Sequence, residues 1–416
     1  MQLSYRHIIF FFIILSIFFL LDTYLWRGYR RTAPKKYFQI FKWLLPLSTL
    51  FFISGGIAQY VRGSKEIYNG VLWLNLIFGL GFGFIVVKIV AGLILFLEDI
   101  YRFGWFAKKK ITKATGLVVM PDRRDFVRKL SLGAASLPLL GSVYAVTKGK
   151  YAFHEKQVHL YLKRLPKSFE GLKVVQFSDF HAGSFDDFEK VKEGLALINK
   201  ANPDIILFTG DLVNNRSIEA LPYVGLLKDL KAKYGKFAVL GNHDYGDYIQ
   251  FDTPEERVEN LLLIEQIYKD ADFQLLNNES VQISNDIDTI DLIGVENWGT
   301  GPFPQYGKIP EAIANTEEDR FNILMSHDPD HWEYEIRNHS KQFDLTLSGH
   351  THGFQVGVSI PGWEWSPAKY RYKRWLGLYQ ENNRYLFVSK GFGFLGFAGR
   401  IGMLPEIVVF TLHCNE

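Results

Sequence analysis

The sequence contains a single cysteine, Cys414, so no disulfide can form within one chain, and an extracytoplasmic location would have to be tolerated without one. It has no internal repeat and no low-complexity segment, which excludes a repeat architecture. Acidic residues are scarce in residues 1–150, which hold 6 Asp and Glu against 21 Lys and Arg. The balance reverses in residues 151–416, where 26 Lys and Arg stand against 38 Asp and Glu. The net charge of +3 therefore averages a basic part and an acidic part.

The acidic part, residues 151–416, is long enough to bury a hydrophobic core of its own. Its excess of carboxylates repels phosphate backbones, so we expect no nucleic acid among the partners. Clustered carboxylates also suit the binding of cations. The sequence identifies neither a protein partner nor an oligomeric state.

Three long hydrophobic segments, Ile8–Trp26, Trp43–Tyr60 and Val71–Leu97, precede the acidic part. Each is long enough to cross a hydrocarbon layer of about 30 Å as a helix. A fourth segment, Leu130–Val146, is shorter and richer in Ala, Gly and Ser. We therefore divide the chain into three parts: a membrane region over 1–129 with three transmembrane helices and basic cytoplasmic loops, a fourth hydrophobic segment over 130–150, and a globular domain over 151–416.

The basic residues of the loops predict the orientation of this membrane region. Six Lys and Arg follow the first hydrophobic segment, two follow the second, and nine lie between the third and the fourth. Lys and Arg gather on the cytoplasmic side of membrane proteins. The alternation therefore places the N-terminus outside, and it places the globular domain outside as well if the fourth segment spans.

The segment Asp122–Lys129 contains the paired arginines Arg123 and Arg124, an aromatic residue and further basic residues, and a mildly hydrophobic stretch follows it. This pattern resembles a twin-arginine export signal, although such signals usually stand at the N-terminus. The alternative is a basic flank that only stops membrane transfer. We expect a multi-pass protein of the bacterial inner (plasma) membrane with a periplasmic or otherwise extracytoplasmic domain.

Lys88 is the only charged residue of Val71–Leu97. We expect its side chain to reach from near the end of its helix to the cytoplasmic interface, as long basic side chains often do. The alternative is a functional charge inside the membrane. The glycines Gly79, Gly81 and Gly83 predict close packing between helices, because small residues let helix backbones approach each other.

From Lys173 onward, short β-branched runs alternate with amphipathic stretches. The predicted strands are Lys173–Ser178, Asp204–Thr209, Phe237–Leu240, Ile290–Val295, Phe321–Ser326, Phe343–Ser348, Tyr385–Ser389 and Ile407–Leu412. The predicted helices are Asp187–Lys200, Ile218–Tyr234, Pro254–Asp270 and Asp330–Asn338. This alternation indicates a layered α/β domain whose central sheets are covered by helices. The Gly- and Pro-rich stretches 299–310 and 359–367 are predicted to be long loops.

Five of the predicted strands run into residues that carry oxygen or nitrogen ligands. These residues are Asp179, His181, Asp211, Asn242 (followed by His243 and Asp244), His327, His350 and His352. In an open α/β sheet, binding sites form at the carboxyl ends of the strands. Carboxylate and amide oxygens combined with imidazole nitrogens suit Mn²⁺, Fe or Zn²⁺. Because the set contains no thiolate, it does not favour a structural zinc site.

In this order and spacing, the blocks Asp-x-His, Gly-Asp, Gly-Asn-His-Asp, His and Gly-His-Thr-His resemble the calcineurin-like metallophosphoesterase superfamily over nearly all of residues 170–416. The resemblance implies a four-layer β-sandwich flanked by helices and two divalent metal ions. The two implied ligand sets share Asp211 as the bridging residue. They are Asp179, His181, Asp211 and His352 for one metal ion, and Asp211, Asn242, His327 and His350 for the other.

The resemblance also implies the chemistry. Two cations a few ångströms apart lower the pKa of a shared water and so supply hydroxide near neutral pH. They also neutralise the phosphoryl oxygens in the transition state. His243 would protonate the leaving oxygen or stabilise the transition state, with Asp244 orienting its ring. The implied activity is the metal-dependent hydrolysis of a phosphodiester or a phosphomonoester.

Further motifs follow in the C-terminal part: Ser348–Gln355, Gly377–Tyr379, Val388–Gly393, Arg400 and Pro405–Ile407. They are similar to a bacterial branch of the superfamily that contains membrane-anchored, often twin-arginine-exported phosphoesterases and relatives of UDP-2,3-diacylglucosamine hydrolases. Phe354 and Lys390 depart from the pattern of that branch, in which glycine and arginine are common at these positions. The departures leave the substrate specificity open.

An aromatic and basic stretch, Trp363–Trp365 with Lys369–Trp375, stands in the acidic domain. It suits a phosphorylated lipid headgroup or an anionic membrane surface, and the alternative is a solvated loop whose aromatic residues cover the edge of the core.

Three functions stay open: a phosphodiesterase acting on phospholipid or lipid-linked headgroups, a UDP-2,3-diacylglucosamine-type pyrophosphatase, and a non-catalytic membrane scaffold with structural metals. An outward-facing domain argues against the second, because its nucleotide substrates are cytoplasmic. His243 and Asp244 argue against the third, because a structural site has no use for them.

Overall fold

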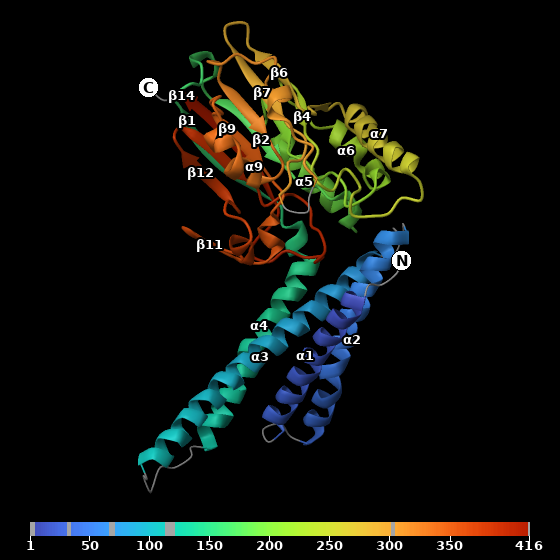
Figure 1. Ribbon diagram of the computed structural model, residues 1–416, viewed down its shortest axis with the longest axis vertical. Helices are drawn as coiled ribbons and strands as arrows, with labels where there is room; N and C mark the ends of the chain where they lie inside the picture. Colours follow the sequence, from blue (N-terminus) through green and yellow to red (C-terminus); the bar gives the residue numbers. More distant parts are fainter. Residues whose placement is uncertain (1–4, 31–34, 66–70, 113–120, 301–303, 415–416) are drawn as a thin grey trace. The chain divides into compact units, whose positions relative to one another are not determined.

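The computed structural model describes residues 5–30, 35–65, 71–112, 121–300 and 304–414. The chain divides into two compact units. One unit contains the N-terminal helices, up to Val61 and from Leu72 to Val146, and the other contains Thr147–Glu416 together with Arg62–Val71. In Figure 1 the N-terminal helices are coloured blue to teal, and the second unit, called here the domain, runs from green to red.

The first unit consists of long helices, and each predicted hydrophobic segment lies within one of them. They are α1 (Tyr5–Tyr29), α2 (Lys35–Lys65), α3 (Val71–Thr112) and α4 (Pro121–Thr147). Among the described residues, two stretches are long and apolar enough to cross a membrane, Ile77–Lys108 and Asp125–Thr147. The twin-arginine-like segment forms the first turns of α4, and the side chain of Arg124 lies outside the described part of the chain.

The predicted role of the glycines in helix packing agrees with the contacts between α2 and α3. A Cβ atom at Gly81 would lie 2.7 Å from the Cα of Phe52, and one at Gly55 would lie 2.9 Å from the Cα of Phe78. Both distances are shorter than real Cβ contacts allow, so larger residues at these positions would push the two helices apart.

Lys88 does not extend to an interface, and the expectation that it does is wrong. Its side chain is buried and its Nζ lies 2.8 Å from Asp22 Oδ1 on α1. The same ammonium donates to the Leu45 carbonyl at 2.6 Å and to Thr49 Oγ1 at 2.5 Å, both on α2. A buried charge is stable only when it is paired and hydrogen-bonded. The sequence could not reveal that Asp22, far along the chain, supplies the partner.

This ion pair joins α1, α2 and α3, so removing one partner leaves an uncompensated buried charge. We expect Lys88→Met or Asp22→Asn alone to destabilise the helical unit by about 3–5 kcal/mol, and the double variant to recover part of the loss. Thermal unfolding of the full chain in detergent measures the effect. Arg102→Gln, which breaks the exposed Asp99–Arg102 pair on α3, is the control and should cost less than about 1 kcal/mol. Equal losses in the single and double variants would contradict the pairing.

The domain contains two six-stranded sheets that pack against each other. The first sheet has the order β1 (His154–Leu162), β14 (Glu406–Cys414), β2 (Leu172–Phe177), β3 (Ile205–Phe208), β4 (Lys236–Ala238) and β5 (Gln274–Leu275). The second has the order β12 (Gly377–Glu381), β13 (Arg384–Val388), β9 (Leu345–Ser348), β8 (Asn322–Met325), β7 (Thr289–Gly294) and β6 (Glu279–Ser284).

Helices cover the outer face of each sheet (Figure 1). They are α5 (Phe188–Lys200), α6 (Val224–Lys228) and α7 (Pro254–Asp270) on the first sheet, and α8 (Ile309–Ala312) and α9 (Pro329–Tyr334) on the second. Alternate residues of β2 face the two sides, because Val174 packs in the core between the sheets and Val175 packs against the helices. The predicted four-layer β-sandwich flanked by helices is confirmed.

The strands that precede the predicted ligands run parallel. β2, β3 and β4 pair in parallel in the first sheet, and so do β7, β8, β9 and β13 in the second. The register aligns Phe177 with Phe208 and Phe208 with Ala238, so the carboxyl ends of three strands lie at one edge. All eight predicted strands are present in the structure. The fold therefore brings the residues after these strands together.

Three predicted elements need correction. The predicted helix Asp330–Asn338 consists of α9, which ends at Tyr334, and a separate 3-10 helix over Ile336–Asn338. The stretch 359–367 is not a plain loop, because β10 (Val358–Ile360) and β11 (Trp363–Trp365) form a hairpin there. Its strands are too short to leave a recognisable alternation in the sequence. The predicted helix Ile218–Tyr234 is a 3-10 helix followed by α6, which ends at Lys228, and Pro222 accounts for the interruption.

Candidate metal centre

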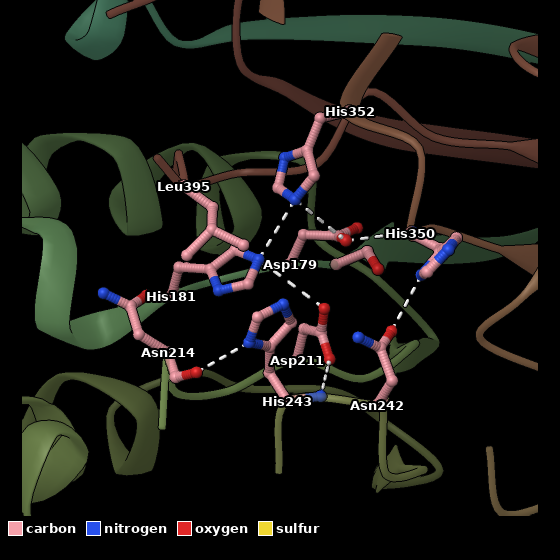
Figure 2. Close-up of polar contacts among 12 residues, drawn as sticks. Asp179, His181, Asp211, Asn214, Asn242, His243, His350, His352 and Leu395 are labelled. Atoms are coloured by element: carbon pink, nitrogen blue, oxygen red, sulfur yellow. Dashed lines mark hydrogen bonds and ion pairs between the residues drawn. The ribbon is translucent and has the colours of Figure 1, made fainter. Parts of the chain in front are cut away.

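The structure brings all seven predicted ligands together at the carboxyl ends of the parallel strands, and Figure 2 labels all of them except His327. Asp179 and His181 follow β2, Asp211 follows β3, Asn242 follows β4, His327 follows β8, and His350 and His352 follow β9. The residues come from both sheets, so the site lies where the two sheets of the sandwich meet.

The backbone at the site is unusual. Five of the seven predicted ligands have positive φ, between 50° and 72°: Asp179, His181, Asp211, His350 and His352. This conformation costs about 1–3 kcal/mol for a non-glycine residue and is found mainly where function requires it. Glycine is needed at neighbouring positions, because a Cβ at Gly241 would lie 2.2 Å from Asp211 Oδ1, and one at Gly349 would lie 2.3 Å from Asp179 Oδ2.

One cluster contains Asp179, His181 and His352, whose ligand atoms lie within 4.8 Å of one another. His181 Nε2 lies 3.0 Å from His352 Nε2, and His352 Nε2 lies 3.3 Å from Asp179 Oδ1. All three side chains are buried. Two imidazole nitrogens and a carboxylate oxygen converge on one point, as they do around a divalent transition metal.

A second cluster contains Asp211, His327 and His350, again within 4.8 Å. Asn242 belongs to the same place, because its Oδ1 lies 2.8 Å from His350 Nδ1. Asp211 Oδ2 lies 3.2 Å from His327 Nε2 and 3.6 Å from His181 Nε2, so one carboxylate oxygen contacts both clusters.

The donor atoms fit two cations. Within the described part of the chain, Asp179 Oδ2 is buried without a hydrogen-bond partner, and the buried His327 Nε2 faces Asp211 Oδ2 at 3.2 Å. Buried polar atoms are rarely left in this state unless a bound group satisfies them. The two clusters therefore have both the ligand types and the unused donor capacity that a pair of divalent cations requires.

The protonation states support the same reading. Burial lowers the pKa of His181 and of His350 to about 3, so both rings are neutral and offer a lone pair. Burial also lowers the pKa of His327, but the nearby Asp211 carboxylate outweighs it and raises the pKa to about 10. In the metal-free protein a proton on His327 thus takes the place of a cation beside Asp211.

His243 lies at the centre without belonging to either cluster. Its ring centroid is 5.0 Å from that of His181, and its backbone N–H donates to Asp211 Oδ1 at 2.9 Å (Figure 2). Its Nδ1 lies 2.6 Å from the Asn214 carbonyl, which is an acceptor only, so Nδ1–H donates. The ring is therefore held through Nδ1, and Nε2 is the atom available for proton transfer.

Asp244 does not orient His243, and this prediction is wrong. Its two oxygens accept hydrogen bonds from four backbone N–H groups, those of Asp211, Leu212, Val213 and Gly241, at 2.8–3.2 Å. Burial and the Asp211 charge raise the pKa of Asp244 to about 7, while the amide donors favour its ionised form. Adjacent residues at a turn face different directions, so sequence adjacency to His243 was misleading. Asp244 instead fixes the loop that carries Asp211.

Asp244→Asn should therefore destabilise the domain, because an amide nitrogen would face backbone donors and leave buried N–H groups unpaired. We expect a loss of about 1–3 kcal/mol in thermal unfolding of the metal-free full chain. His243→Asn should change stability by less than about 1 kcal/mol, as should the control Glu193→Gln in the exposed Lys190–Glu193 ion pair. An Asp244→Asn variant as stable as the control would refute this role.

Three further side chains at the site were given no role by the sequence reasoning. Arg400 is buried and donates from Nη2 to His352 Nδ1 at 3.0 Å. Tyr372 OH lies 3.1 Å from His350 Nε2, and Tyr248 OH accepts from Asn242 Nδ2 at 2.7 Å. Arg400 and Tyr372 stood within quoted motifs, but no spacing rule connects them to a ligand. Only the fold shows that they hold the ligand side chains.

Family models match two parts of the chain. Residues 5–150 match a model described as a probable calcineurin-like phosphoesterase transmembrane domain. Residues 172–354 match the model of the calcineurin-like phosphoesterase domain, which contains all seven predicted ligands.

Curated relatives agree. An uncharacterized metallophosphoesterase of Bacillus subtilis, YkuE, is 31% identical over 302 residues, which cover 71% of this chain and 99% of the relative. The UDP-2,3-diacylglucosamine pyrophosphatase LpxG of Chlamydia muridarum is 27% identical, covering 48% of this chain and 69% of the relative. A bovine transmembrane protein with a metallophosphoesterase domain is also 27% identical, and the match covers 70% of this chain and 64% of the relative.

The chain is thus a metal-dependent phosphoesterase associated with a membrane. It belongs to the calcineurin-like metallophosphoesterase family.

Proposed function

We propose that this protein hydrolyses phosphodiester bonds, or phosphomonoester bonds, of phospholipid or lipid-linked headgroups, and that it uses two divalent metal ions held by the seven residues of the centre. The observation that carries this proposal is the position of Asp211, whose Oδ2 contacts a histidine of each cluster. A single carboxylate placed between two sets of ligands is suited to bridge two cations, which a structural site for one ion does not need.

In this proposal the ligand sets are Asp179, His181, Asp211 and His352 for one ion, and Asp211, Asn242, His327 and His350 for the other. The mixture of carboxylate, amide and imidazole donors favours Mn²⁺, Fe or Zn²⁺. Tyr372 OH positions His350 from behind by accepting from Nε2–H. Arg400, held by the carbonyls of Lys390 and Gly393, packs against the Nδ1 side of His352.

When bound, two such cations lower the pKa of a shared water and neutralise charge on the phosphoryl oxygens. The chain itself supplies the proton. In the substitution at phosphorus, the water would lose a proton to solvent as its oxygen forms a bond to phosphorus, and the bond from phosphorus to the leaving oxygen would break. His243 Nε2 delivers a proton to that leaving oxygen, and the Asn214 carbonyl holds the ring through Nδ1.

Two variants separate metal binding from proton transfer. Asp211→Asn should lose bound metal and activity together, because the amide has no negative charge and only one ligand oxygen to offer the two clusters. His243→Asn should keep the metal content and lower kcat by about 10²–10⁴-fold. Metal analysis of the purified full chain and turnover of bis(p-nitrophenyl) phosphate with added Mn²⁺ provide the measurements.

The matched control is His159→Asn, an exposed histidine on β1, which should leave both quantities unchanged. Wild-type turnover in His243→Asn would rule out the proton-transfer role. Full metal content in Asp211→Asn would rule out the bridging role.

Two observations support a substrate at the membrane. The N-terminal part matches a transmembrane family, which keeps the domain near a bilayer. The two LpxG relatives, each 27% identical, are named as enzymes that act on UDP-2,3-diacylglucosamine, a lipid-linked pyrophosphate. The second candidate is therefore a pyrophosphatase of that type. Hydrolysis of a UDP-linked acylated sugar without hydrolysis of simple diesters would favour it.

We also propose that the protein is a multi-pass inner-membrane protein with its domain on the extracytoplasmic side, as the loop charges predict. A periplasm-dependent reporter such as alkaline phosphatase, fused after Lys150, should then be active. The same fusion with a reporter that works only in the cytoplasm should be inactive. The reverse pattern would place the domain in the cytoplasm and would favour the nucleotide-linked substrate.

A further inference from the structure

The β10–β11 hairpin next to the metal centre is built with its apolar face outward. The strand register pairs Val358 with Trp365 and Ile360 with Trp363, so these four side chains share one face. Val358, Ile360 and Trp363 are 43%, 54% and 52% exposed. A hairpin on the surface of a soluble domain normally turns its apolar face to the core and its polar face to water.

On the polar face of the hairpin, Glu364 is held against the domain, whereas Ser359 is exposed. Glu364 Oε1 lies 2.8 Å from Nζ of Lys390, whose side chain is buried, and Ser359 Oγ donates to the same Glu364 oxygen at 2.8 Å. Lys390 Nζ also lies 3.8 Å from Glu406 Oε2 at the start of β14. The ion pair with the buried Lys390 and the Ser359 hydrogen bond therefore fix the orientation of Glu364, and with it the outward direction of the apolar face.

Basic and aromatic residues extend this surface. Tyr370 is 75% exposed and Phe354 is 44% exposed. Lys369, Arg371 and Lys373 are exposed between or beside them, in a domain whose net charge is otherwise negative. Tryptophan and tyrosine with neighbouring lysine and arginine are the residues that proteins place at the interface of an anionic bilayer.

Residues at the metal centre stand both before and after the hairpin in the sequence. The ligand His352 begins the short turn His352–Gln355 that leads into β10. After β11 the chain reaches Tyr372, whose OH lies 3.1 Å from Nε2 of the ligand His350. Ser366 Oγ donates to the Gly353 carbonyl at 2.5 Å and closes the loop between these two points. Whatever binds the hairpin is thus brought next to the centre.

We propose that the docking surface, formed by Phe354, Val358, Ile360, Trp363, Lys369, Tyr370 and Arg371, binds the interface of an anionic phospholipid bilayer. The charge complementarity and the membrane family of the N-terminal helices both favour a bilayer as the occupant. Docking in this way presents headgroup phosphoesters to the metal centre without extracting the lipid. This last step rests on the proposed function, whereas the binding itself does not.

The binding is tested with the full chain in liposomes of phosphatidylethanolamine and phosphatidylglycerol. Because Cys414 is the only cysteine, the Cys414→Ser background allows a single Ile360→Cys label with an environment-sensitive nitrobenzoxadiazole probe. The probe should show a blue-shifted emission and be quenched by brominated acyl chains. Replacing phosphatidylglycerol by phosphatidylcholine should weaken the quenching, because the basic residues lose their anionic partners.

The matched control is Ile287→Cys, an 80% exposed isoleucine in the turn between β6 and β7. This turn precedes β7, which runs parallel to β8, so it lies at the opposite end of the sheet from the metal centre. Its probe should stay in water and be quenched little. Equal emission and equal quenching at the two positions would overturn the proposal. So would an Ile360 probe shielded from water but not quenched by lipid, which would indicate a protein partner instead.

A second experiment compares two substrates with the same leaving group. Ile360→Glu should lower kcat/KM at least tenfold for a hexadecyl p-nitrophenyl phosphate embedded in the liposomes, relative to kcat/KM for soluble bis(p-nitrophenyl) phosphate. Ile287→Glu should leave the ratio unchanged. An unchanged ratio in Ile360→Glu would overturn presentation of the lipid. If the wild-type chain hydrolyses neither compound, the proposed function fails, while the quenching result still decides whether the surface binds a bilayer.

Discussion

The Asp211 carboxylate is the contact on which the arrangement of the site depends. One of its oxygens contacts His181 of one cluster and His327 of the other, and the other oxygen accepts the backbone N–H of His243. Such a placement requires the loop after β3 to be rigid, and Asp244 supplies that rigidity by accepting four backbone amides. The Asp211 carboxylate thus contacts the two histidine clusters, whereas the Asp244 carboxylate holds the backbone of the loop in place.

The sequence was sufficient to predict that the seven side chains meet, because each lies within four residues of the end of a strand, and parallel strands bring their ends to one edge. Asn242 and His350 could therefore be placed together although they are distant in sequence. Position after a strand does not predict the partner of a side chain when that partner depends on rotamer and turn geometry. His243 is adjacent to Asp244 but contacts Asn214, and Lys88 finds Asp22 on another helix. Contacts of this kind leave no periodic signal.

The short elements of the fold were missed for a related reason. β10 and β11 are three residues each, and a run of three cannot show the alternation that identifies a longer strand. Pro361 and Gly362 stand at the turn of the hairpin, and the same two residues are typical of a loop without strands. The unusual feature of the hairpin is which face it exposes, and this depends on the Glu364–Lys390 contact. In the sequence, Lys390 stands out only as a departure from the arginine that is common at this position in the related bacterial branch.

The N-terminal helices and the β10–β11 hairpin share one pattern: charged side chains pair inside and apolar side chains are exposed. In the helices, Lys88 and Asp22 turn inward and pair, while Phe12, Phe19, Leu93 and Phe96 are exposed on the outside. In the hairpin, Glu364 turns inward and pairs with Lys390, while Ile360 and Trp363 are exposed. Charges inside and apolar groups outside are unfavourable in water and favourable in lipid, because only the hydrocarbon accepts the exposed groups without cost. The hairpin is therefore built for the same solvent as the helices, and this is the physical reason to expect that the metal centre works at the surface of a bilayer.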